Sequence, residues 1–133
     1  VQWSENVDNS NRNFFRSPNL YGNFIATYAP KKHFQNNLSF IYTGSMFTPH
    51  YAGFISNDQL EKTRSFHEIN WKSAYIFSVS NSLQLEVSGG IQNILNSYQR
   101  DFDSGINRDA VYIYGPSRPR TVFIGLKLGT DLL

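Results

Sequence analysis

Polar and apolar residues alternate with a period of two along five segments of the chain, and helical periodicity is weak. In the fourth segment, for example, Leu85 and Val87 alternate with Glu86 and Ser88. This alternation is typical of a β-strand, in which successive side chains point to opposite faces of a sheet. The pattern predicts an all-β chain with strands at residues 19–29, 37–48, 66–78, 83–93 and 120–129.

The two faces of the predicted strands differ in chemistry. One face carries aliphatic and aromatic residues mixed with glycine, and the other carries amides, hydroxyls and charges, although Phe123 interrupts the alternation of the last segment. The charged residues of the polar face are Glu68, Lys72, Glu86 and Lys127. Charges on such a face suit a water-filled lumen better than the solvated back of a soluble sheet. The aromatic residues near strand ends that suit an interfacial girdle are Tyr21, Tyr28, Phe47, Phe66 and Phe77.

The connections between the predicted strands alternate in length. Residues 30–36 and 79–82 are short turns, and Pro30 is expected to stop the first strand because it cannot donate to a central ladder. The segments at 3–18, 49–65 and 94–119 are long. If consecutive strands pair antiparallel, all long segments lie at one end of the sheet. Transmembrane barrels have this asymmetry, so an antiparallel up-and-down meander in a barrel wall is predicted.

Composition narrows the classes of function without deciding between two β architectures. The 133 residues include no cysteine, which excludes disulfides and thiolate metal sites, and a net charge of +2 gives no sign of a nucleic-acid partner. Aromatic residues make up 16% of the chain, which fits strands and membrane interfaces alike. No apolar run reaches the roughly 20 residues of a transmembrane helix. A soluble antiparallel sandwich also alternates, so that architecture stays open.

Few residues point to chemistry. His33, His50 and His67 have no partner at metal-ligand spacing and are interpreted as ordinary surface or lumen residues. No motif for a catalytic nucleophile, a zinc protease or a nucleotide is present. The chain is therefore not expected to be an enzyme, and no cofactor is expected.

One acidic cluster has two interpretations. Asp101, Asp103 and Asp109 offer the oxygen ligands that Ca²⁺ accepts, although no Glu closes the segment as in an EF-hand. In the favoured alternative the carboxylates accept backbone N–H bonds and pair with arginines of a structured loop. The candidate arginines are Arg100, Arg108 and Arg118.

Two regions, residues 51–54 and 98–114, mix aromatic side chains with Arg and Asp, as recognition surfaces do. The same residues also suit a cap on the mouth of a barrel. The predicted ligand-binding residues of these loops are Tyr51, Phe54, Tyr98, Arg100, Asp101, Asp103, Arg108, Asp109, Tyr112, Tyr114 and Arg118.

A more specific pattern covers residues 89–128. Residues 92–96 form a QN-I-L-N phrase, residues 98–109 a YQ-D-D-G-RD phrase, and residues 112–121 a Y-YGP--PRT phrase before the last amphipathic strand. This succession resembles the C-terminal signature of TonB-dependent outer-membrane receptors. The resemblance is detailed over these residues, and upstream it depends on the strand pattern.

The resemblance implies a fold and a function. Residues 1–133 would form the C-terminal part of a β-barrel domain, the last strands of a 22-stranded transmembrane barrel, with the plug domain and the earlier strands absent. Such receptors recognise a ligand and import it actively across the Gram-negative outer membrane. The implied partners are outer-membrane lipid, TonB through an N-terminal region absent from this chain, and a small-molecule or metal-chelate ligand, with cobalamin, haem or a siderophore favoured. Because the strands are too few to close a barrel, edge-to-edge self-association of the chain is expected.

Two alternatives come from other classes. The first is a soluble β-sandwich that binds carbohydrate by stacking Trp3 or Tyr51 on a sugar. The second is a hydrolase that uses Asp101 or Asp103 with Glu86, although no nucleophile accompanies them.

Overall fold

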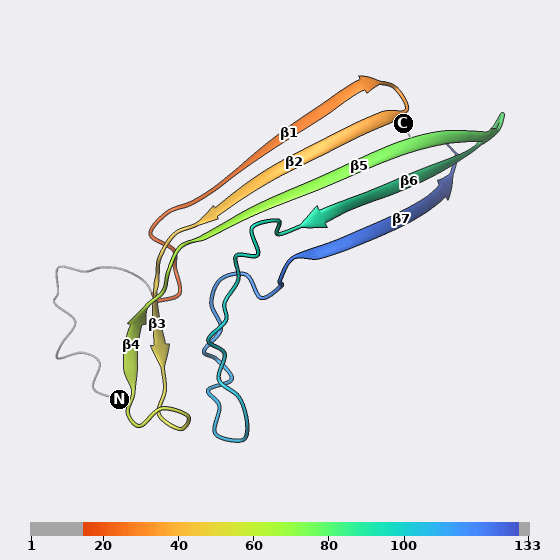
Figure 1. Ribbon diagram of the computed structural model, residues 1–133. Coiled ribbons are helices and arrows are strands. Elements are labelled where there is room, and N and C mark those ends of the chain that lie inside the picture. The colour runs from red at the N-terminus through yellow and green to blue at the C-terminus, as the bar shows by residue number, and fades with distance from the viewer. Residues whose placement is uncertain (1–14, 131–133) are drawn as a thin grey trace.

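The computed structural model describes residues 15–130, and every regular element in that part of the chain is a β-strand. Figure 1 shows five long strands side by side, with a short hairpin and a long irregular loop at one end of them. The strands are β1 (Tyr21–Lys31), β2 (Phe34–Thr43), β3 (Phe47–His50), β4 (Gln59–Lys62), β5 (Phe66–Ser80), β6 (Leu83–Gln92) and β7 (Thr121–Gly129).

Strands β1, β2, β5, β6 and β7 form one antiparallel sheet in that order. Neighbours in the sheet are neighbours in the chain, apart from the β3–β4 hairpin inserted between β2 and β5. The predicted all-β antiparallel meander is therefore confirmed. The sheet is open, with β1 and β7 at its edges, and residues 15–130 show no closed barrel.

The register of the ladders gathers the apolar residues of all five strands on one face. One row across the sheet consists of Ala26, Leu38, Trp71, Ile91 and Val122. Another consists of Phe34, Tyr75, Val87 and Leu126. On the opposite face a row runs through Thr27, Asn37, Lys72, Gly90 and Phe123. We call these the apolar face and the polar face.

No part of residues 15–130 covers the apolar face. On β7, Val122 is 74% exposed and Ile124 81%. Other large side chains of this face that are more than a third exposed are Phe24, Tyr28, Leu38, Phe40, Trp71, Tyr75, Phe77, Leu126 and Leu128. A soluble sandwich needs a second sheet packed against such a face. The described residues contain no such sheet.

The prediction that Pro30 stops the first strand is wrong. β1 continues to Lys31, and its ladder with β2 shifts register between Tyr28 and Lys31. A proline is accepted at an edge strand or a bulge because its missing N–H is not needed by the ladder there. The turn predicted at residues 30–36 is consequently confined to residues 32–33.

The second predicted strand, residues 37–48, is divided between two elements. β2 ends at Thr43, and the chain bends at Gly44 before β3 begins. A Cβ atom at Gly44 would lie 2.8 Å from the backbone oxygen of Leu20, closer than real Cβ atoms come, so the bend favours glycine. The segment predicted to be irregular, residues 49–65, contains half of β3 and all of β4.

The predicted asymmetry of the connections is confirmed where the structure describes them. The hairpin segment (residues 44–65) and the return loop (residues 93–120) lie at one end of the sheet. The turns at residues 32–33 and 81–82 lie at the other end. Most of the third long segment, which includes Trp3, lies outside the described residues.

A small core lies at the long-loop end of the sheet. Its members are Met46, Phe66, Tyr112 and Tyr114. Phe66 is fully buried, and a Cβ atom at Gly115 of the return loop would lie 2.3 Å from its ring. Phe66 points to the polar face, since it pairs with Thr43 and alternates with His67. The return loop therefore folds over the polar face, and Phe66 was wrongly predicted to be an interfacial residue.

The other four residues predicted to form an interfacial girdle do not lie on one face of the sheet. Tyr28 and Phe77 are exposed on the apolar face near the short turns, as a girdle requires. Tyr21 lies on the polar face, and Phe47 lies in β3 outside the large sheet. Only two of the five predicted positions therefore suit an interface.

Candidate functional site

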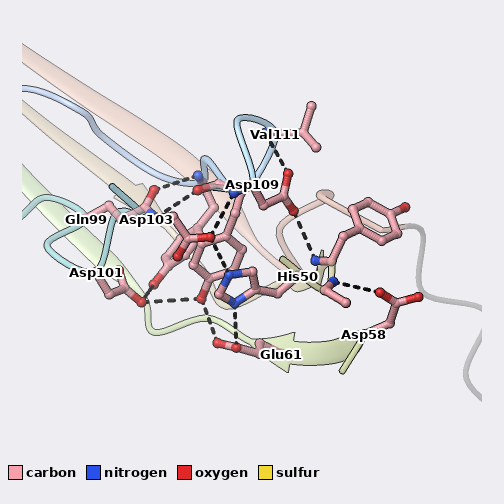
Figure 2. A network of polar contacts seen from close by, with 12 residues as sticks. His50, Asp58, Glu61, Gln99, Asp101, Asp103, Asp109 and Val111 are labelled. Carbon is pink, nitrogen blue, oxygen red and sulfur yellow. Dashed lines mark hydrogen bonds and ion pairs between the residues drawn. The ribbon is translucent and has the colours of Figure 1, made fainter. Parts of the chain in front are cut away.

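The hairpin segment and the return loop pack against each other through one polar network, drawn in Figure 2. His50 is its centre, and acidic side chains from both segments surround the imidazole. Its members come from β3, β4 and the return loop, which are far apart in sequence.

His50 joins the two segments. Its Nδ1 lies 3.0 Å from Oε1 of Glu61 in β4, and its Nε2 lies 2.7 Å from Oδ2 of Asp103 in the return loop. The imidazole also stacks on Tyr112, with ring centroids 3.7 Å apart and planes inclined by 9°. His50 is 5% exposed, and the side chain of Asp103 is 2% exposed. We call His50, Glu61 and Asp103 the histidine clasp.

The histidine clasp favours a charged imidazole, because a neutral ring has one N–H donor and satisfies only one of two carboxylates. Burial lowers the pKa of His50, but the hydrogen bonds and charges of Glu61 and Asp103 outweigh it and raise that pKa above 6.5. Burial also opposes ionisation of Asp103, yet His50 and the Asp109 N–H hold the pKa of Asp103 below 3.8. At a pH between these two pKa values the protonated imidazole of His50 lies between the carboxyl groups of Glu61 and Asp103.

Two tyrosines extend the network. The Tyr112 hydroxyl donates to Oε2 of Glu61 at 2.6 Å, and the Tyr114 hydroxyl donates to Oδ2 of Asp101 at 2.5 Å. Burial first, and then the hydrogen bond to Asp101, raise the pKa of Tyr114 to about 12. Burial and the hydrogen bond to Glu61 raise the pKa of Tyr112 well above 10. Both phenols are therefore neutral donors at neutral pH.

Side chains also brace the return loop from within. Gln99 is fully buried; its amide donates to the carbonyl of Tyr112 at 3.2 Å and accepts from the N–H of Tyr114 at 2.8 Å. Asp109 accepts the backbone N–H of Tyr51 at 3.1 Å, which is a second link to the hairpin segment. These contacts connect the two arms of the return loop and tie the loop to the hairpin segment.

Asn93 closes the base of the return loop. It is 2% exposed and has a φ of +50°, a conformation that asparagine adopts more readily than most residues. Its side-chain amide donates to the carbonyls of Ser97 at 3.2 Å and Arg118 at 2.8 Å, and its N–H donates to the side chain of Asn70 at 2.8 Å. The asparagine of the QN phrase therefore stabilises the base of the return loop.

The three carboxylates of the acidic cluster have separate partners, and the expected backbone N–H bonds are confirmed at Asp103 and Asp109. The expected arginine partners are wrong, because no ion pair joins these carboxylates to an arginine in the described part of the chain. Within residues 15–130 no group of three or more His, Cys, Asp or Glu is placed to hold a metal ion. The acidic side chains there therefore do not support the calcium alternative.

The remaining predicted ligand residues are more exposed. Tyr51 is 37% exposed and Phe54 is 52% exposed, both in the hairpin segment. The side chains of Arg108 and Arg118 are exposed and take no part in the network. Asp101 belongs to the network through Tyr114, and with Arg100 it lines a recess beside the histidine clasp; the guanidinium of Arg100 lies against the ring of Tyr98.

Reasoning from the sequence missed three central residues, namely His50, Glu61 and Gln99. The interpretation of His50 as an ordinary surface or lumen residue is wrong. Its partner Asp103 is 53 positions away, and no spacing rule connects them. Pairing of β3 with β4 brings His50 and Glu61 near each other, but β4 was not predicted, so this pair could not be recognised from the sequence.

Comparisons with known proteins found no matching family model and no significant match among curated proteins or solved structures. Residues 15–130 contain no helix that is long and apolar enough to cross a membrane.

Proposed function

We propose that this chain is the C-terminal part of the barrel domain of a TonB-dependent receptor in the Gram-negative outer membrane. Its five long strands would be the last of a 22-stranded wall, and its two long connections would help to capture an extracellular ligand. The observation that carries the proposal is the single-layered sheet, whose apolar face is uncovered while its polar face bears charges.

The exposed area is too costly to leave in water. Eleven large side chains of the apolar face are between 38% and 81% exposed. Complete burial of one such side chain contributes about 1.5–3 kcal/mol, so covering all eleven contributes on the order of 10 kcal/mol or more. That is comparable with the whole stability of a typical domain, about 5–15 kcal/mol. Acyl chains would cover this face without a second protein layer.

The strand length also suits a bilayer. β6 has ten residues, which span roughly 33 Å at the usual rise per residue. A strand of that length, tilted by about 40°, rises about 25 Å, the height of the apolar band of outer-membrane barrels. The apolar rows extend along most of this length, from Leu85 to Ile91.

The polar face suits a hydrated lumen. Lys72 and Glu86 form an ion pair at 3.4 Å on this face, and the return loop folds over it at the long-loop end. Glu86 lies towards the short turns, whereas Asp101 and Asp103 lie in the return loop. The arrangement therefore does not support the hydrolase alternative, and the proposed function includes no bond-breaking step.

The transport step would depend on regions outside this chain. TonB would act through a plug domain, and the energy for import would come from the inner membrane. The sequence signature favours cobalamin, haem or a siderophore as the ligand. The contribution of this chain would be part of the wall and part of the binding surface.

Trp71 allows a direct test, since it lies 39% exposed on the apolar face. The complete gene product would be placed in lipid vesicles with every other tryptophan replaced by phenylalanine. We expect lipids brominated on their acyl chains to quench Trp71 fluorescence strongly, because bromine quenches on contact.

A matched control moves the probe to the other face. Trp71→Phe combined with Ile25→Trp places the indole on the polar face, and we expect little quenching by brominated lipid there. Quenching of Trp71 by aqueous iodide, without quenching by brominated lipid, would rule out the proposed barrel wall.

A further inference from the structure

A recess of about 380 Å³ opens beside the histidine clasp, between the end of β4 and the return loop. Its wall is formed by Glu61, Lys62, Thr63 and Arg64 on one side and by Arg100, Asp101, Tyr112 and Tyr114 on the other. Its size lies within the range of small-molecule sites, roughly 300–1,000 Å³.

Tyr98 brings two arginines to this recess. The guanidinium of Arg64 donates to the carbonyl of Tyr98 and lies 5.2 Å from the ring centroid of Phe66. The guanidinium of Arg100 lies 5.2 Å from the ring centroid of Tyr98 itself. These contacts position both guanidinium groups and leave most of their N–H donors available.

The charges of the recess are not balanced. Its two carboxylates already accept hydrogen bonds, Glu61 from Tyr112 and His50, and Asp101 from Tyr114. Its three cations are Lys62, Arg64 and Arg100, and none of them forms an ion pair with a residue that the structure describes. The recess therefore has three cations against two carboxylates, and its cations are free of ion pairs with the described residues.

We propose that this recess binds the oxyanion group of a small solute, a carboxylate or a phosphate, through Arg64 and Arg100. A planar guanidinium matches either group with two parallel hydrogen bonds, and Tyr98 holds one guanidinium from each segment at the recess. The role of the recess in ligand capture rests on the proposed function. An anion site in the recess would restrict the ligand to a solute that carries an oxyanion group.

The test is titration of the complete gene product, in detergent micelles at low salt, with succinate, inorganic phosphate and uncharged erythritol. Isothermal calorimetry is expected to show binding of at least one anion and none of erythritol. Binding of succinate alone identifies a carboxylate site, and binding of phosphate alone identifies a phosphate site. Absence of anion binding at millimolar concentration, or equal binding of erythritol, overturns the proposal.

Arg100→Gln is the informative variant, because Arg100 is exposed and its loss should not disturb the core. Loss of its charge-assisted bonds is expected to weaken anion binding at least about tenfold. Arg108→Gln removes the same charge from the same loop outside the recess, and it should leave the affinity unchanged. Equal affinity in the Arg100→Gln variant and the original protein contradicts the site, whatever the lipid-quenching result.

Discussion

At the scale of single residues, one imidazole connects two segments that are 53 positions apart. His50 has a carboxylate on each ring nitrogen and the ring of Tyr112 stacked against its plane, so it contacts three side chains at once. Hydrogen bonds between charged groups contribute about 1.5–3 kcal/mol each. The packing of the return loop on the hairpin segment is therefore expected to depend on the protonation of the histidine clasp.

The sign of this pH dependence follows from the two shifted pKa values. Because the pKa of His50 is raised, its contribution is complete below 6.5 and is lost as pH rises through the higher folded value. Because the pKa of Asp103 is lowered, its contribution is complete above 3.8 and is lost as pH falls through the folded value. Protection factors for hydrogen exchange in the return loop should therefore be highest between these two limits.

His50→Gln should abolish the loss of protection above pH 6.5, because a neutral amide does not titrate. Protection at lower pH should fall in this variant, since the charged pairs are gone. His33→Gln is the control, because His33 lies at the short-turn end of the sheet and should leave the profile of the loop unchanged. An identical pH profile for His50→Gln and the original protein would exclude the histidine clasp.

Two adjacent glycines of β6 offer a second prediction. A Cβ atom at Gly90 would lie 2.2 Å from the backbone oxygen of Trp71, whereas one at Gly89 would be in ordinary contact, 3.5 Å from the oxygen of Phe123. Gly90→Ala is expected to destabilise the protein by about 1–3 kcal/mol because the ladder must shift. Gly89→Ala should leave the stability unchanged or raise it by up to about 1 kcal/mol, because alanine loses less backbone freedom on folding than glycine. Urea unfolding in vesicles, followed by fluorescence, compares the two, and equal stabilities would contradict this account.

Gly90 also explains the residue that interrupts the alternation of the last predicted strand. Phe123 pairs with Gly90, and its ring would lie 2.9 Å from a Cβ atom there. The ring occupies the space that the glycine leaves on the polar face. Alternation alone could not predict this, because the reason lies on the neighbouring strand and not in the segment itself.

At the scale of strands, local alternation was sufficient to predict which residues share a face. It failed at Pro30 and Gly44, where tertiary context decides the outcome: an edge position accepts the proline, and a close backbone approach requires the glycine. The β3–β4 hairpin was missed because its strands have only four residues each and mix polar with apolar positions. The candidate site depends on that hairpin, so it was predicted only in part.

The two faces of β1 predict an order of lysine tolerance opposite to the order expected from the hydrophobicity of the replaced residues. Ile25 and Ala26 are adjacent in β1, but Ile25 lies on the polar face and Ala26 on the apolar face. In the proposed barrel wall, Ala26→Lys should destabilise the fold by about 2–4 kcal/mol, the cost of a lysine near the bilayer centre. Ile25→Lys should stay within about 0.5 kcal/mol, as surface substitutions do.

Heat-modifiable electrophoretic mobility of the complete gene product measures the folded fraction of both variants. A scale based on residue type alone expects the opposite order, because isoleucine is more apolar than alanine. A larger loss for Ile25→Lys would mean that the faces are reversed with respect to lipid.

At the scale of the whole molecule, the sheet has two sources of instability in water, which are the uncovered apolar face and the free edges at β1 and β7. Detergent covers a face but does not pair an edge, because detergent tails offer no N–H or C=O groups. The two sources are therefore separable by experiment. The histidine clasp and the small core at the long-loop end are independent of both, so the loops are expected to keep their structure in detergent.

Residues 1–133 produced alone should aggregate in plain buffer, because an exposed apolar face and unpaired edges both promote association. Addition of detergent should disperse the aggregates only as far as small oligomers, since the edges of β1 and β7 remain free to pair. Sedimentation velocity distinguishes these states. A dispersed monomer in plain buffer would show that the apolar face is covered from within the chain, and in that case neither lipid contact nor a place in a barrel wall would be needed to explain this sheet.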